Sequence, residues 1–171
     1  MRIVLLATLA FALTACNTAS EETLDEPAPG AVRAETEPAV PVDTVSDYMP
    51  TEPVADAMPA GPEVVARGAF SGDSGHDASG EAVLYRLDDG SYSVRLEGFT
   101  VDNGPALEVW LVQRTSGDIA RGGVSLGALK STNGNQNYVV PAGTDAASFA
   151  GVSIWCERFS VNFGTAPLGG V

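Results

Sequence analysis

Apolar and polar residues alternate with a period of two along the C-terminal part of the chain, from about Val64 onward. The apolar runs are short, and glycine, asparagine and aspartate turns separate them at intervals of roughly ten residues. No sustained helical stripe interrupts this pattern. It predicts an all-β domain over residues 64–171, an antiparallel β-sandwich or barrel-like fold of about seven or eight strands.

The alternation places individual strands. Residues 80–87 and 91–97 flank an Asp-Asp-Gly turn, and Asp-Gly favours the positive φ of a tight hairpin. Residues 106–112 are too apolar to be exposed on both faces, so we expect them to form a strand inside a sheet. The remaining expectations are turns at 102–105 and 132–135, strands at 136–140, 151–156 and 160–166, and one helical turn at 145–149.

Residues 16–63 show neither the strand period nor the helix period. Between Ser20 and Glu63, eleven acidic residues stand against Arg33 alone, and the same stretch holds eight of the eleven prolines. Such a composition cannot bury enough apolar surface to offset the entropy lost on ordering. We therefore expect a disordered tether of about 45 residues, whose mean reach of roughly 40 Å would hold the domain away from its attachment point.

The first residues have the form of a secretory signal. Arg2 supplies a positive charge, residues 3–13 are an apolar segment of roughly ten residues, and Leu13, Thr14 and Ala15 lead into Cys16. The segment is far shorter than the ~20 apolar residues of a transmembrane helix.

These residues resemble the lipobox of bacterial lipoproteins. The resemblance implies cleavage of a signal peptide at residues 1–15 and acylation of Cys16. In proteins of this kind an aspartate after the cysteine commonly signals retention at the inner membrane, but this chain has Asn17 there. We therefore expect an outer-membrane lipoprotein of the cell envelope, with the domain in the periplasm or at the cell surface.

The charge of the chain bears on its partners. The net charge is −13, and residues 20–63 contribute ten of these negative charges; the domain itself carries eleven acidic and seven basic residues. Nucleic-acid binding requires a basic patch, so we expect no nucleic-acid partner. The partners expected instead are the membrane, through the lipid on Cys16, and a redox or protein partner in the envelope that the sequence does not identify.

Cys156 is the candidate redox residue. If Cys16 carries lipid, Cys156 is a lone thiol in an oxidising compartment, where lone thiols are uncommon. In an extended strand, Cys156 shares one face with Val152 and Ile154. An inert packing residue and a reactive thiol are both open interpretations. Arg158 would lie on the same face if the strand continued, and its charge would favour the thiolate.

His76 is the only histidine, and the glycine-rich stretch at 72–80 around it indicates a loop. It is either a solvated side chain or a cofactor ligand or proton partner of Cys156. A blue-copper site is excluded, because it needs two histidines and usually a methionine, and residues 64–171 contain no methionine. The attachment motif of c-type haem is absent, which leaves Cys156 or His76 as a single axial haem ligand that nothing requires.

No metal site is predicted, and the cofactor stays unassigned. The large aromatic residues of the domain are expected in its core: Phe99, Trp110, Trp155, Phe159 and Phe163.

Four segments resemble the successive motifs of the DM-thirteen domain family in order and spacing. They are GPALEVWL at 104–111, LGALK at 126–130, GNQNY at 134–138 and VSIWCERFSVNFG at 152–164. This family is associated with DOMON domains in animal surface proteins, occurs in bacterial lipoproteins and is implicated in electron transfer through a central cysteine. The resemblance covers about residues 66–169, with one departure at Ala106, where members more often carry an acid.

The resemblance implies an electron-transfer component acting through Cys156 rather than a stand-alone enzyme. The alternative is a non-catalytic interaction module of the envelope in which Cys156 is a buried structural residue. Solvent access to the thiol distinguishes the two.

Overall fold

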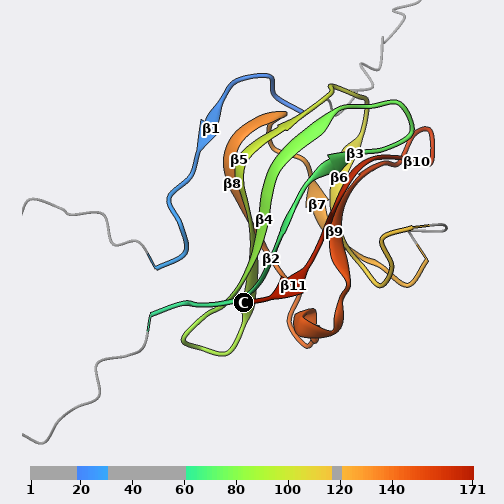
Figure 1. Cartoon of the computed structure of the whole chain (residues 1–171). Helices are drawn as coiled ribbons and strands as arrows, with labels where there is room; N and C mark the ends of the chain where they lie inside the picture. The colour runs from blue at the N-terminus through green and yellow to red at the C-terminus, as the bar shows by residue number, and fades with distance from the viewer. Residues whose placement is uncertain (1–18, 31–60, 117–120) are drawn as a thin grey trace, which may run out of the picture.

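Figure 1 shows the computed structural model of the chain, which describes residues 19–30, 61–116 and 121–171. The expectations for the signal segment, for Cys16 and for residues 31–60 lie outside these ranges. No helix within the described ranges has the length and apolarity needed to cross a membrane.

Two open β-sheets pack into a sandwich, as the alternation predicts (Figure 1). One sheet has the strand order β1-β8-β5-β4-β2-β11 and the other the order β3-β10-β9-β6-β7. The strands are β1 (Leu24–Asp25), β2 (Glu63–Ala69), β3 (Ser71–Gly72), β4 (Ala78–Arg86), β5 (Tyr92–Val101), β6 (Leu107–Val112), β7 (Val124–Ala128), β8 (Asn133–Val139), β9 (Gly151–Cys156), β10 (Val161–Pro167) and β11 (Gly169–Gly170).

The described residues contain eleven strands, and ten of them, β2–β11, belong to the domain for which seven or eight were predicted. Three of the eleven strands, β1, β3 and β11, are two residues long, and so short a strand leaves no alternation to detect. Neither sheet closes on itself, so the fold is a sandwich and not a barrel.

Most of the predicted elements are confirmed. Strands β4 and β5 form the predicted hairpin, β6 lies inside its sheet between β9 and β7, and a 3₁₀ turn spans Ala146–Ser148. The turn predicted at 132–135 is wrong, because β8 already begins at Asn133. Gly134, with a φ of 98°, pairs with Phe99 next to a bulge of β5, in which Glu97 and Gly98 stand opposite Asn135.

The core lies between the sheets and uses the alternate positions of their strands. Val109, Ile154 and Cys156 on one sheet, and Val94 and Leu96 on the other, are fully buried. This arrangement follows from the two-residue period, since every second side chain of a strand points inward.

Only part of the aromatic set lies in this core. Phe99 and Phe163 are buried, whereas Trp110 and Trp155 are half-buried. The expectation is wrong for Phe159, which is 63% exposed. Strand β9 ends at Cys156, so Phe159 falls in the turn before β10 rather than on an inward strand position.

Residues 19–30, which we call the N-terminal strap, run along the outer edge of the first sheet (Figure 1). Strand β1 pairs in parallel with β8, with Leu24 opposite Gly134, and Ser20 forms a further bridge with Ser131. The expectation of disorder is therefore wrong for residues 19–30. Backbone pairing orders them despite a composition that is typical of disorder.

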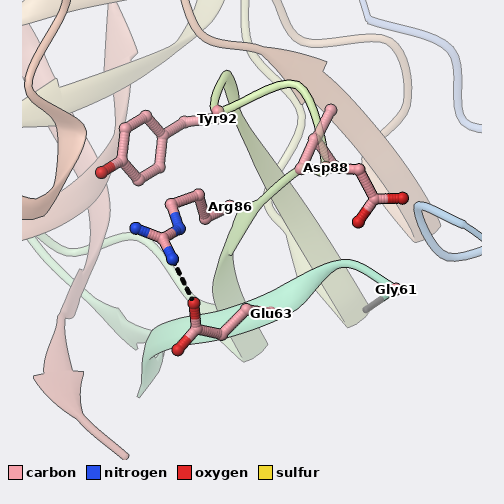
Figure 2. A pocket seen from close by; sticks show the side chains of 7 residues that line it. Gly61, Glu63, Arg86, Asp88 and Tyr92 are labelled. Carbon is pink, nitrogen blue, oxygen red and sulfur yellow. Dashed lines mark ion pairs between the residues drawn. The ribbon is translucent and has the colours of Figure 1, made fainter. Parts of the chain in front are cut away.

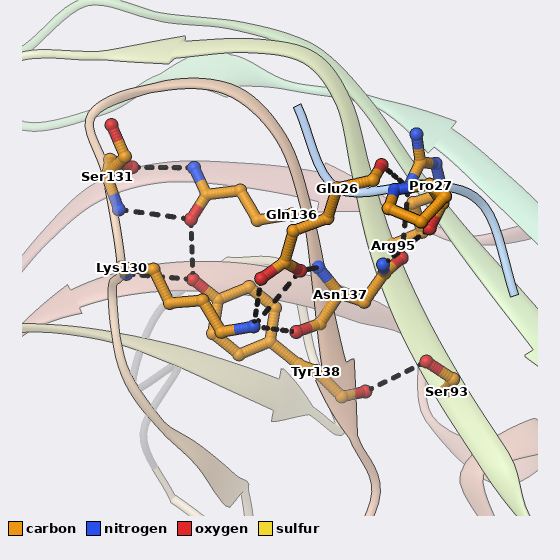
Figure 3. Close-up of polar contacts among 9 residues, drawn as sticks. All are labelled: Glu26, Pro27, Ser93, Arg95, Lys130, Ser131, Gln136, Asn137 and Tyr138. Atoms are coloured by element: carbon orange, nitrogen blue, oxygen red, sulfur yellow. Dashed lines mark hydrogen bonds and ion pairs between the residues drawn. The ribbon is translucent and has the colours of Figure 1, made fainter. Parts of the chain in front are cut away.

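Specific polar contacts hold the strap in place (Figure 3). The Glu26 carboxylate accepts hydrogen bonds from Lys130 Nζ at 2.8 and 3.0 Å and from the Asn137 amide at 2.5 Å. Arg95 Nη1 donates to the Glu26 carbonyl at 2.6 Å. Desolvation raises the pKa of Glu26, but these hydrogen bonds and the charges of Lys130 and Arg95 outweigh it and lower the pKa below its ordinary value.

The surface under the strap is itself fixed by a buried amide. Gln136 is fully buried; its Nε2 donates to the Ser131 carbonyl at 2.6 Å, and its Oε1 accepts from the Tyr138 hydroxyl at 2.7 Å (Figure 3). A buried polar group with all its partners in place defines one backbone arrangement. The strap therefore binds a preformed edge.

The acidic segment at 31–60 connects the strap to β2. A Cβ added to Gly30 would lie 2.4 Å from Pro62 Cδ, so the two ends of this segment lie together. Gly30 and Pro62 are the described residues on this side and the far side of 31–60, and the expectation for residues 31–60 themselves lies outside the described ranges. Only residues 17 and 18 separate Cys16 from the strap.

Candidate functional site

A pocket lies at one end of the sandwich, where the loop after β3, the start of β6 and the β9–β10 turn meet. We call it the aromatic pocket. Its volume is about 510 Å³, within the usual range for small-molecule sites. It is lined by Ser74, His76, Asn103, Gly104, Pro105, Phe159, Val161 and Phe163.

A tight turn carries His76 into this pocket. The His76 amide donates to the Asp73 carbonyl at 2.9 Å, and the two intervening residues, Ser74 and Gly75, have φ values of 55° and 84°. Asn162 Nδ2 on β10 donates to the Asp73 carboxylate at 2.8 Å, and this hydrogen bond holds the pKa of Asp73 below its ordinary value despite desolvation. The loop is therefore fixed to β10.

The imidazole of His76 stacks on a buried ring. Its centroid lies 3.6 Å from that of Phe163, and the two planes are 7° apart. Nδ1 lies 3.5 Å from Asp102 Oδ2, and the side chain is 32% exposed. His76 also lines the pocket, so its imidazole is accessible from there.

Cys156 lies beneath the wall of the same pocket. It is the last residue of β9, it is 0% exposed, and it pairs with Leu107 on β6 and Val161 on β10. Its Sγ donates to the Pro105 carbonyl at 3.1 Å. Pro105 and Val161, which bond and pair with Cys156, also line the pocket, so the buried thiol lies next to the pocket wall.

The structure therefore brings His76 and Cys156 to one end of the fold, but it records no hydrogen bond between them among the described residues. The expectation for Arg158 is wrong in its geometry, because the strand does not continue past Cys156. Residues 157–160 form a turn in which Ser160 has a φ of 51°, so Arg158 does not follow Cys156 along one strand face.

The lining of the pocket is mostly apolar, with Ser74, His76 and Asn103 as its polar side chains. It contains no lysine, arginine or carboxylate, while Asp73, Asp77, Asp102, Glu157 and Arg158 lie in the loops beside it. Within the described ranges, no three His, Cys, Asp or Glu side chains come together as a metal site would require. The arrangement suits a flat, uncharged ring better than a metal ion or an anion.

The sequence did not indicate Pro105, Phe159 or Phe163 as site residues. Phe163 stacks on His76 from 87 positions away, and only the sheet topology brings them together. The turn after Cys156 was the available signal for Phe159, but its position depends on where β9 ends.

A second pocket lies beside the turn that joins β4 and β5 (Figure 2). Gly61, Glu63, Arg86, Asp88 and Tyr92 contribute to its lining, and Arg86 Nη2 is paired with Glu63 Oε2 at 3.0 Å. Both members of this ion pair are more than half exposed. None of the predicted site residues lies there. The two charges of such an exposed ion pair attract each other only weakly.

Comparison with known proteins assigns the chain to a family. No curated protein and no solved structure matches the chain. The model of the family described as Electron transfer DM13 matches residues 69–168, more than half of the chain. The match includes Cys156 and every residue that lines the aromatic pocket. The chain belongs to the DM13 electron-transfer family.

Proposed function

We propose that this protein is an electron-transfer module of the cell envelope, anchored by lipid on Cys16, which exchanges electrons at the aromatic pocket above Cys156. The observation that carries this proposal is the shared wall: Pro105 and Val161 line the pocket on one side and contact or pair with Cys156 on the other. Family membership supports the electron-transfer class.

Burial of Cys156 determines which chemistry the closed structure allows. A thiol reacts as the thiolate and needs access to its target, whereas Cys156 is 0% exposed and hydrogen-bonded to a carbonyl. Direct exchange therefore requires the turn at 157–160 to open. The Cys156 thiolate would then attack a disulfide of a partner protein, forming one new S–S bond, while the other partner sulfur leaves as a thiolate and takes up a proton.

A redox group held in the pocket has no such requirement, because an electron crosses to it without a bond to sulfur. We therefore place the electron carrier in the pocket, against His76 and Phe163. Cys156 is then the thiol behind the carrier, and its own redox chemistry depends on the opening of the turn.

A second candidate function is favoured by the complete burial of Cys156. In that case the domain is a non-catalytic interaction module of the envelope, and the cysteine is a packing residue. The two functions differ in whether the protein takes up electrons reversibly.

The test uses the mature acylated protein purified from membranes of a bacterial host. Its absorption spectrum is followed through cycles of reduction by dithionite and oxidation by ferricyanide. We expect a reversible change that falls at least about tenfold in His76→Ala and persists in Val139→Ser, which replaces an exposed residue of β8 outside the pocket.

The Cys156→Ser variant separates the two places for the carrier. A signal that persists in it assigns the carrier to the pocket, whereas its loss in a folded variant assigns the carrier to the thiol. A wild-type protein with no reversible signal would support the interaction module and contradict the proposal.

A further inference from the structure

We infer that the aromatic pocket binds the ring of a membrane-soluble quinone, which enters from the lipid surface to which Cys16 is attached. The inference rests on the proposed function for the lipid anchor. It specifies the chemical class of the carrier and the route by which the carrier arrives.

The lining selects the class of ligand by its charge. Flavin nucleotides carry phosphates and haem carries propionates, and proteins usually bind both kinds of group with arginine or lysine. The pocket has neither in its lining, and in the loops beside it the acidic residues Asp73, Asp77, Asp102 and Glu157 outnumber Arg158, the neighbour of Phe159 in the chain. An anionic cofactor is disfavoured here, whereas an uncharged quinone is not.

The shape and the polar groups of the pocket also suit a quinone. The stacked pair of His76 and Phe163 offers a flat surface, and Phe159 and Val161 provide further apolar contacts. The imidazole of His76, which lines the pocket, would supply a hydrogen bond to one ring oxygen of the ligand. This combination of an aromatic wall and one polar atom orients a ring that carries oxygen at its edge.

The strap places the pocket close to the anchor. Glu21 of the strap accepts a hydrogen bond at 2.9 Å from Nδ2 of Asn103, and Asn103 lines the pocket. Five residues lead from Cys16 to Glu21, and even a fully extended chain of that length spans at most about 18 Å. Whatever path these residues take, the rim of the pocket therefore lies no farther from residue 16 than this limit plus the lengths of the Glu21 and Asn103 side chains.

The surface around the pocket fits a position at the lipid interface. Phe159 is 63% exposed and projects an aromatic ring at the pocket. Phenylalanine is among the residues with which proteins that bind a lipid surface bury apolar contacts at its boundary. A quinone dissolved in the bilayer would thus find an apolar entrance within reach of the membrane surface.

Photo-labelling tests the inference on the full acylated protein in liposomes. The probe is an azido-benzoquinone with an isoprenoid tail, and the labelled peptides are mapped by mass spectrometry. We expect labels on peptides that contain residues 103–105 and 157–163, displaced by unlabelled quinone. Phe159→Ser should reduce labelling about fivefold, whereas Val139→Ser, which replaces a residue with 76% exposure on β8, should not change it.

Two further arms test the route from the membrane. Insertion of about 20 glycine and serine residues after Cys16 should reduce labelling by the tailed probe and leave labelling by a tail-less, water-soluble probe unchanged. Labelling of the wild type by the water-soluble probe alone would overturn membrane delivery. Absence of labelling by both probes in a protein that cycles electrons would overturn the quinone and leave the proposed function standing, whereas labelling without any redox cycling would overturn the proposed function.

Discussion

Substitution of Gly134 by alanine should detach the N-terminal strap from the domain. Gly134 lies in β8 directly opposite Leu24, and a Cβ added to it would lie 1.9 Å from the Leu24 carbonyl oxygen. Backbone cannot yield as the end of a flexible side chain does, so the strap has to move away. Gly127→Ala is a matched control, because Gly127 has a similar φ, 104° against 98°, and its added Cβ would meet nothing within 4 Å.

The difference between the two variants isolates the strap. Alanine at such a positive φ costs about 1–2 kcal/mol, and both variants share this strain. Only Gly134→Ala also loses the contacts of the strap near Leu24, including the Glu26 amide bond to the Asn135 carbonyl at 2.9 Å and the Glu26–Lys130 pair. At about 1 kcal/mol for each of two to four hydrogen bonds, its free energy of unfolding should be lower by a further 2–4 kcal/mol.

The assay combines calorimetry with hydrogen exchange. With roughly 4 °C for each kcal/mol in a domain of this size, Gly134→Ala should melt about 8–16 °C below Gly127→Ala. The amides of residues 19–30 should exchange fast in Gly134→Ala and slowly in the control. Equal melting temperatures together with a protected strap in both variants would refute the account of how the strap binds.

Three further predictions concern single side chains. Glu26→Gln should lower the free energy of unfolding by about 1 kcal/mol at neutral pH. Because folding lowers the pKa of Glu26, the contribution of its carboxylate is present above the unfolded pKa and is lost as the pH falls through the folded pKa. The melting temperatures of variant and wild type should therefore converge in acid, and a difference that persists there would contradict this prediction. Native Cys156 should be alkylated far more slowly than in denaturant, and Cys156→Ala should cost about 1–2 kcal/mol in chemical denaturation; equal alkylation rates would contradict its burial. Cys16→Ser should lack acyl mass in mass spectrometry and leave the membrane fraction; a wild-type protein without acyl mass would remove the anchor.

The interior of the sandwich could be predicted from the sequence because one physical rule governs it. Alternation along a strand decides which side chains face inward, so Val152, Ile154 and Cys156 are all buried as a set. The same rule gave the β4–β5 hairpin, where the Asp-Gly turn fixes the connection. Alternation does not reveal strands of two residues such as β1 and β3, since they are shorter than one full period.

The strap could not be predicted because its composition and its environment point in opposite directions. An acidic, proline-rich sequence favours disorder, yet Glu26 forms an ion pair with Lys130, 104 positions later, and β1 pairs with the open edge of β8. Such contacts depend on the finished sheet.

The aromatic pocket could not be predicted for the same reason: its contacts depend on the finished fold. His76 and Phe163 become neighbours through topology, and Phe159 becomes exposed because β9 ends at Cys156. Sequence reasoning identified the histidine and the cysteine as candidates. Phe159 and the Pro105 carbonyl, however, belong to loops that the strand period does not describe, and the contact of Phe163 in β10 with His76 depends on the assembled fold.

Coulometric titration of the protein purified from cells tests the central claim most directly, since it counts electrons without assuming the chemical identity of the carrier. The account predicts reversible uptake of at least about one electron per protein, lost in His76→Ala under conditions in which this variant melts like the wild type. No reversible uptake by the wild-type protein, or the same uptake by the His76→Ala variant, would contradict an electron-transfer site at the aromatic pocket.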